Sequence, residues 1–213
     1  QCRDIAEREW GIKNDYEAVL ICSDGYIQTD PREIFNTEKV TTIASHHQTH
    51  ALSALYLSPF DKALIVSYDG GGDDGHFNIY VGDKQNGKIK LLKKVESDFG
   101  GGYLLCGAMV REVSESSRHM LALSGKIMGL CAYGDVIEEY VDAFSEFFFD
   151  RDFNKLAKVT GLPLKNVDTP WKDPLQMYVF EDKKGYDISA SAQAGFENAF
   201  FSVLDKYDTE VPL

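Results

Sequence analysis

The sequence lacks the features that mark membrane-spanning, secreted and nucleic-acid-binding proteins. It has no apolar run of about eighteen residues, and its first residues show no signal-peptide pattern. Its four cysteines include no Cys-x-x-Cys pair, which favours buried free thiols in a reducing cytoplasm over a disulfide framework. Basic residues are few, 22 Lys and Arg against 34 Asp and Glu, and the formal net charge of −12 argues against a nucleic-acid partner. We therefore predict a cytoplasmic protein that binds neither membranes nor nucleic acid.

The composition predicts a folded protein with a hydrophobic core. The chain has 213 residues, of which 44% are hydrophobic and 26% charged, enough for one large domain or two small ones. It begins with Gln1 in a segment of helical pattern, so we interpret it as an internal piece of a longer protein. Strands are predicted at 39–44, 63–68, 77–81 and 89–95. Helices are predicted at 45–57, 103–113, 136–149 and 187–206, with an irregular segment at 150–186.

Three of the five histidines lie between positions 46 and 50, at the start of a predicted helix. His46 and His50 are four residues apart, so a helix places both imidazoles on one face, about 5–6 Å apart. Two such imidazoles can chelate a divalent transition metal, and Asp69, at the end of the next predicted strand, can add an anionic ligand. His47 points elsewhere, toward a substrate or a neighbouring strand. The simpler alternative is that the histidines only cap the helix and form local hydrogen bonds.

Three consecutive glycines, Gly70, Gly71 and Gly72, follow Asp69, and Asp73 and Asp74 follow them. Glycines after a strand permit positive φ angles and close backbone approach, so their amides can face a phosphate group. The alternative is a flexible hairpin turn. The two aspartates can bind magnesium through water or simply solvate the turn.

A second glycine-bracketed segment contains Gly125 and Lys126, where a lysine can reach a phosphate as a point charge. The spacing is not that of a P-loop, and an ordinary surface lysine is the alternative.

Taken together, these motifs resemble the O-carbamoyltransferases of antibiotic and nodulation-factor biosynthesis. The resemblance rests on His-His-Gln-Thr-His-Ala-Leu-Ser-Ala-Leu-Tyr-Leu-Ser-Pro-Phe at 46–60 and Tyr-Asp-Gly-Gly-Gly-Asp at 68–73. Gly-Lys-Ile-Met-Gly-Leu-Cys-Ala-Tyr-Gly at 125–134 and Asp-Ile-Ser-Ala-Ser-Ala-Gln-Ala-Gly-Phe-Glu at 187–197 extend it. The order and rough spacing of the motifs agree over about residues 40–206.

The resemblance implies an α/β fold of the actin-like ATPase (ASKHA, ribonuclease H-like) type, mostly its first lobe, with a mixed sheet and flanking helices. It divides the chain into an uncertain N-terminal part at 1–37, a motif-bearing core at 38–135, a helical or irregular insertion at 136–186, and a helix leading to a missing second lobe at 187–213.

The same resemblance implies an enzyme that uses ATP and carbamoyl phosphate to make carbamoyl-adenylate and passes the carbamoyl group to an acceptor hydroxyl. It assigns a metal, usually iron(II), to His46, His50 and Asp69, with magnesium accompanying the nucleotide. A separate YrdC-like domain would form the adenylate, and His47 is a candidate general base. The alternatives are a tRNA threonylcarbamoyl transferase and a non-enzymatic actin-like nucleotide-binding module.

Overall fold

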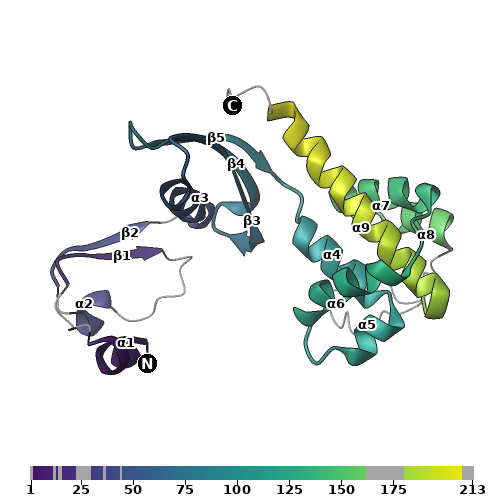
Figure 1. Ribbon diagram of the computed structural model, residues 1–213, viewed down its shortest axis with the longest axis horizontal. Helices are drawn as coiled ribbons and strands as arrows, with labels where there is room; N and C mark the ends of the chain where they lie inside the picture. Colours follow the sequence, from purple (N-terminus) through teal and green to yellow (C-terminus); the bar gives the residue numbers. More distant parts are fainter. Residues whose placement is uncertain are drawn as a thin grey trace. The chain divides into compact units, whose positions relative to one another are not determined.

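The computed structural model of the chain is a mixed α/β protein (Figure 1). It describes residues 2–11, 13, 16–22, 30–35, 37–43, 45–161 and 180–207. The density of contacts divides the chain into two compact units, residues 1–93 and 94–213. This division falls within the segment 38–135 that the family resemblance treats as one core. None of the described helices has the length and apolar character needed to cross a bilayer.

The first unit begins with short elements. Helix α1 (Cys2–Trp10) ends at Gly11, whose φ of +65° is a conformation that glycine adopts without strain. Strands β1 (Val19–Cys22) and β2 (Val40–Ile43) form a parallel pair, and helix α2 (Pro31–Ile34) precedes β2.

The rest of the first unit is a helix packed on a three-stranded sheet. Helix α3 spans His46–Leu57, and the strands β3 (Lys62–Gly72), β4 (Gly75–Asp83) and β5 (Lys88–Val95) are hydrogen-bonded in that order. Ala51 and Leu55 on α3 pack against Ile65 on β3 and Tyr80 on β4, and these four side chains are at most 6% exposed. This core joins the helix to the hairpin that β3 and β4 form.

Strand β3 differs from the predicted strand at 63–68 in its length and its burial. We expected a strand buried on both faces and followed by a glycine loop, but β3 continues to Gly72 and its residues are mostly half-buried or exposed. The antiparallel ladder with β4 has a bulge between the pairs Tyr68–Phe77 and Gly72–Gly75. Gly71 lies within it at a φ of +138°, which favours glycine. The glycines therefore belong to a bulged strand, and the turn itself is at Asp73 and Asp74.

The second unit is helical. Its elements are α4 (Phe99–Ala108), α5 (Arg111–Ser116), α6 (Ala122–Leu130), η1 (Cys131–Tyr133), α7 (Glu138–Asp150), α8 (Phe153–Thr160), α9 (Asp182–Leu204) and η4 (Asp205–Tyr207). The prediction of an irregular segment at 150–186 is wrong for α8 and for the start of α9, while 162–179 lie outside the described residues. Helix α4 also begins before the predicted residue 103, because the Asp98 carboxylate accepts the Gly101 N–H and caps it.

Aromatic rings and a close helix contact form the core of the second unit. The ring centroid of Phe148 lies 5.9 Å from that of Phe99 and 5.5 Å from that of Phe196, so α4, α7 and α9 share one aromatic cluster. The buried side of α9 includes Ile188, Ala192, Gly195, Ala199 and Val203. Gly195 permits the approach of α7, because a Cβ placed there would lie 2.6 Å from the Cβ of Phe144.

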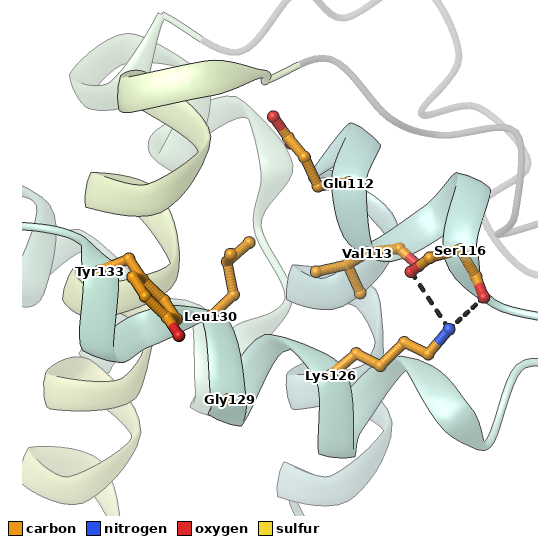
Figure 2. A pocket seen from close by; sticks show the side chains of 7 residues that line it. All are labelled: Glu112, Val113, Ser116, Lys126, Gly129, Leu130 and Tyr133. Atoms are coloured by element: carbon orange, nitrogen blue, oxygen red, sulfur yellow. Dashed lines mark hydrogen bonds between the residues drawn. The ribbon is translucent and has the colours of Figure 1, made fainter.

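Lys126 on α6 caps the C-terminal end of α5 (Figure 2). Its ammonium group donates to the backbone carbonyl of Ser116 and, at 3.1 Å, to the Oγ of the same residue. A lysine at the last carbonyls of a helix satisfies orphan acceptors and favours the negative end of the helix dipole. A surface hollow of about 380 Å³ lies beside it, lined by Glu112, Val113, Ser116, Lys126, Gly129, Leu130 and Tyr133.

Candidate metal centre

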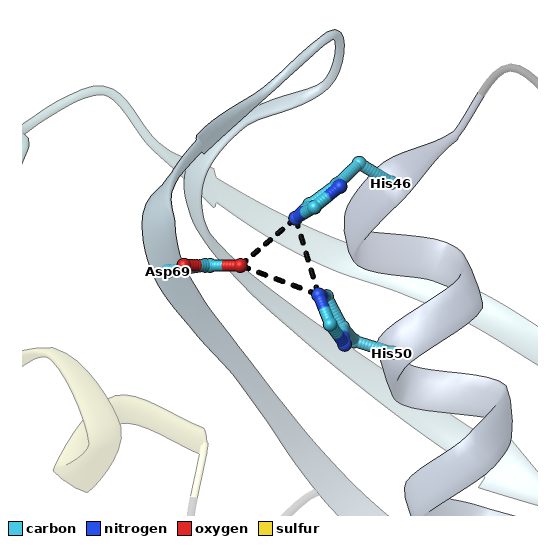
Figure 3. A group of neighbouring side chains, drawn as sticks. All are labelled: His46, His50 and Asp69. Atoms are coloured by element: carbon cyan, nitrogen blue, oxygen red, sulfur yellow. Dashed lines mark hydrogen bonds and ion pairs between the residues drawn. The ribbon is translucent and has the colours of Figure 1, made fainter. Parts of the chain in front are cut away.

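Helix α3 and strand β3 present three side chains to one another (Figure 3). His46 and His50 lie one turn apart at the start of α3, as their spacing predicts. Side chains alternate along a strand, so Asp69 lies on the face of β3 that also carries Ile65 and Ser67, which contact α3. The structure thus brings together the three side chains that the sequence singles out as metal ligands.

The three ligand atoms are close enough to share one ion. Asp69 Oδ2 lies 2.9 Å from His46 Nε2 and 3.3 Å from His50 Nε2, and the two Nε2 atoms are 3.1 Å apart. Metal–ligand bonds of about 2.1 Å would put right-angled ligand pairs about 3.0 Å apart and tetrahedral pairs about 3.4 Å apart. The observed separations are close to this range, so the donor set fits one divalent ion bound from one side.

This group of side chains opens to solvent. The side chain of His50 is 55% exposed, that of Asp69 46% and that of His46 27%. Structural zinc sites are usually closed by four protein ligands, whereas reactive sites keep positions for water or substrate. Two imidazoles and one carboxylate on an open face are typical of a reactive metal site.

The negative charge of Asp69 favours a cation between the three groups. The hydrogen bond with His46 and the N–H of Gly70 hold the pKa of Asp69 below its usual value, so this carboxyl group is an anion at neutral pH. Without an ion, at least one imidazole must point an Nε2–H into the shared space. With the proton on Nδ1 instead, both Nε2 lone pairs are available as ligands, and a cation removes their mutual repulsion.

His47 has a different environment from its neighbours. It is fully buried, with Nδ1 2.8 Å from Ser67 Oγ and Nε2 2.8 Å from the Gly75 carbonyl oxygen. Because a carbonyl only accepts, Nε2 carries the proton and Nδ1 accepts from the Ser67 hydroxyl when the ring is neutral. Both nitrogens are therefore occupied in joining α3 to β3 and β4. This geometry suits a structural residue, and it gives the predicted role as general base no support.

Asp73 and Asp74, in the turn between β3 and β4, accept hydrogen bonds from the first residues of α3. Asp73 Oδ1 accepts the N–H of His46 at 2.9 Å, and the two oxygens of Asp74 accept the N–H of His47 at 3.0 and 3.1 Å. Burial alone would raise the pKa of Asp74, but the N–H of His47 and the hydroxyl of Ser45 outweigh it and lower the pKa. Ser45 is the N-cap residue, as predicted, yet its hydroxyl donates to Asp74 instead of capping the helix itself.

Each glycine of the bulge has a different environment. The amide of Gly70 donates to Asp69 Oδ1 at 2.6 Å, and a Cβ added at Gly70 would meet no atom within 4 Å. A Cβ at Gly72 would lie 2.5 Å from the Cβ of His46, so the first imidazole needs glycine at this position. The sequence does not reveal this contact. His76 Nδ1 lies 3.1 Å from the Gly70 carbonyl oxygen and, as the donor, braces the bulge.

Gly125 and Lys126, the other predicted nucleotide contacts, lie on α6 of the second unit. Lys126 donates hydrogen bonds to Ser116 (Figure 2). A Cβ at Gly125 would meet no atom within 4 Å. A phosphate contact from either residue stays a prediction.

Comparisons with known proteins identify the family. A family model for the carbamoyltransferase N-terminus matches residues 13–198. The nodulation protein NolNO of Sinorhizobium fredii is 29% identical over 189 residues, which make up 87% of this chain and 25% of that protein. The nodulation protein NolO of Bradyrhizobium diazoefficiens is 28% identical over 169 residues, 75% of this chain and 28% of that protein. An uncharacterized protein of Methanocaldococcus jannaschii is 28% identical over 172 residues, 78% of this chain and 31% of that protein.

The chain therefore spans between 25% and 31% of the length of these relatives. The match to the family model extends over most of the chain and includes the histidines of α3 and the bulged strand β3. On this ground the chain belongs to the family of carbamoyltransferase N-terminal domains.

Proposed function

We propose that this chain carries part of the transfer site of an ATP-dependent O-carbamoyltransferase. The complete protein would take a carbamoyl group from carbamoyl phosphate, activate it as carbamoyl-adenylate in a YrdC-like domain outside this chain, and pass it to a small-molecule hydroxyl. Membership of the carbamoyltransferase family supports the reaction class. The observation that supports a metal-dependent transfer site is the convergence of His46, His50 and Asp69.

We further propose that the fold is the first lobe of an actin-like domain. The three-stranded sheet covered by α3 and the mixed α/β composition are compatible with such a lobe. The divisions at 1–37, 38–135, 136–186 and 187–213, with a second lobe to follow, belong to this proposal.

The metal proposed for the three ligands is iron(II), since two imidazoles and one carboxylate on an open face suit a non-haem iron site. When bound, such an ion supplies a Lewis acid for the carbamoyl carbonyl and positive charge for the adenylate phosphate. Asp69 would lower the net charge of the ion with its ligands, and the two histidines would hold the ion beside α3.

The transfer step is an acyl substitution. The acceptor oxygen forms a bond to the carbamoyl carbon, the bond from that carbon to the phosphate oxygen breaks, and AMP leaves with the electron pair. The acceptor proton goes to a base or to solvent. Nucleotide contacts from Gly70, Gly71, Gly72, Asp73, Gly125 and Lys126, with magnesium on the nucleotide, remain predictions. Asp73 and Lys126 already have partners in the protein.

Metal analysis of the full-length protein tests the proposal. We expect stoichiometric iron or zinc in the wild type, its loss in His50→Ala, and no change in His119→Ala, which removes an exposed histidine of the second unit. Release of AMP that depends on carbamoyl phosphate should follow the metal content. Equal metal content in the two variants would refute the site, and ATP binding without metal would favour a non-enzymatic module.

A further inference from the structure

We propose that Asp73 and Asp74 are positioning residues that set the metal affinity of the site by clamping the first turn of α3 to the β3–β4 turn. The inference rests on the proposed metal site. It is an alternative to the predictions that the two aspartates bind magnesium through water and that Asp73 contacts the nucleotide.

The clamp consists of hydrogen bonds from the start of α3 to the two carboxylates. The N–H groups of His46, His47 and Gln48 donate to them at 2.9–3.4 Å, and the hydroxyl of Ser45 donates at 2.7 Å. These amides have no acceptor within the helix, because the first-turn N–H groups of any helix lack one. Two anions from a neighbouring turn therefore take the role that a capping side chain usually takes, and their charge suits the positive end of the helix.

His46 is held by this hairpin at both ends. Its backbone N–H is 2.9 Å from Asp73 Oδ1, and its Nε2 is 2.9 Å from Asp69 Oδ2. As the first residue of α3, His46 is the ligand most exposed to fraying of the helix, whereas His50 lies a turn further in. Anchoring the first turn thus fixes the position from which the first imidazole reaches the ion.

Two further hydrogen bonds hold the turn that carries these carboxylates. The buried side chain of Asn78, which is 1% exposed, donates to the Asp74 carbonyl oxygen at 3.0 Å. The Gly75 carbonyl accepts from His47 Nε2, so the residue after the turn also holds the helix. Three of the four carboxylate oxygens of the pair accept hydrogen bonds from the start of α3, so a second cation bound by these oxygens would compete with the helix start for them.

Asp83 provides a matched control. It lies at the other end of β4 and also organises a turn, since its carboxylate accepts from the backbone N–H and the side-chain amide of Asn86 at 3.1 and 2.8 Å. The length of β4, at about 3.3 Å per residue, separates it from the site. Asp83→Ala therefore removes comparable hydrogen bonds without touching α3.

The test is Co²⁺ binding to the full-length protein, followed by visible absorption and calorimetry, with urea unfolding measured in parallel. We expect Asp74→Ala and Asp73→Ala to weaken Co²⁺ binding about tenfold or more, in line with losses at residues that orient ligands, and to change the cobalt spectrum. Asp83→Ala should lower the unfolding midpoint but leave affinity and spectrum unchanged. Asp74→Asn, which keeps an oxygen acceptor, should fall in between, and it serves if Asp74→Ala does not fold.

Folded variants of Asp73 and Asp74 that bind Co²⁺ like the wild type would overturn the proposal, and so would loss of Mg²⁺-nucleotide binding with unchanged Co²⁺ affinity. Failure of the metal site itself is recognised separately. In that case, wild type and His50→Ala would bind Co²⁺ equally, or neither would bind it.

Discussion

Replacing Gly72 by alanine should damage the metal site although Gly72 is not a ligand. The added Cβ would lie 2.5 Å from the Cβ of His46 and 2.7 Å from its Cγ. Carbon atoms in contact are about 3.5–4.0 Å apart, so helix and strand must separate locally by roughly 1 Å. The buried contacts of Ala51 and Leu55 with the sheet oppose that movement. Metal–ligand distances tolerate only about 0.2 Å. We therefore expect Co²⁺ affinity to fall by at least about tenfold, an effect comparable to losing a residue that orients a ligand.

Gly70→Ala is the matched control, because it changes a glycine of the same strand where an added Cβ meets no atom within 4 Å. Its Co²⁺ affinity should stay within about twofold of wild type. Calorimetric titration of both variants with Co²⁺, after circular dichroism has shown that they are folded, makes the comparison. Wild-type affinity in a folded Gly72→Ala protein would show that the contact with His46 does not control the site.

Three further predictions concern stability and reactivity. Gly195→Ala should lower the unfolding free energy by about 1–3 kcal/mol, because its Cβ would lie 2.6 Å from a carbon of α7, whereas Gly129→Ala, with open space on α6, should raise it by up to about 1 kcal/mol. The folded-state pKa of Asp74 is lowered, so its stabilisation is complete above the usual value of about 3.9 and is lost as the pH falls through the folded value. The urea midpoint of Asp74→Asn should therefore fall less than that of wild type between about pH 6 and about pH 3. Burial raises the pKa of the thiols of Cys106, to about 12, and of Cys131, but of these two only Cys106 is completely buried, so iodoacetamide at about pH 8 should alkylate the half-buried Cys131 in the native protein and Cys106 only after unfolding.

Each of these predictions has a clear contrary result. Equal effects of the two glycine substitutions would show that the close approach of α7 and α9 is unimportant. Parallel pH profiles would remove Asp74 as a source of acid sensitivity. Native-state labelling of Cys106, identified by peptide mass spectrometry, would contradict its complete burial.

Much of the fold is visible in local sequence patterns. The helix predicted at 45–57 matches α3, because an N-cap serine and a Ser-Pro stop enclose it. The strand predicted at 77–81 corresponds to the centre of β4. The end of β3 was missed because glycines weaken the strand pattern, and only pairing with β4 shows that Gly72 belongs to the sheet.

The candidate site was predictable in its ligands but not in its support. Helical spacing alone puts His46 and His50 on one face, and alternation along β3 then turns Asp69 toward them. The bonds of His47 and of Asp74 depend on how α3 lies on the hairpin, which no local pattern specifies. An acidic pair after three glycines is equally compatible with a solvated turn, so the sequence left its role open.

The helix–hairpin arrangement has a consequence for how the protein is made. Its contacts are local, since Ser45 and Asp74, which meet at the start of α3, are separated by only 29 positions in the chain. Closing so short a loop costs little chain entropy and is fast. Once Asp83 has left the ribosome, every residue of the ligand cluster and its clamp is available, and a metal ion present at that moment would favour the docking of α3 on β3, the two elements that carry the ligands.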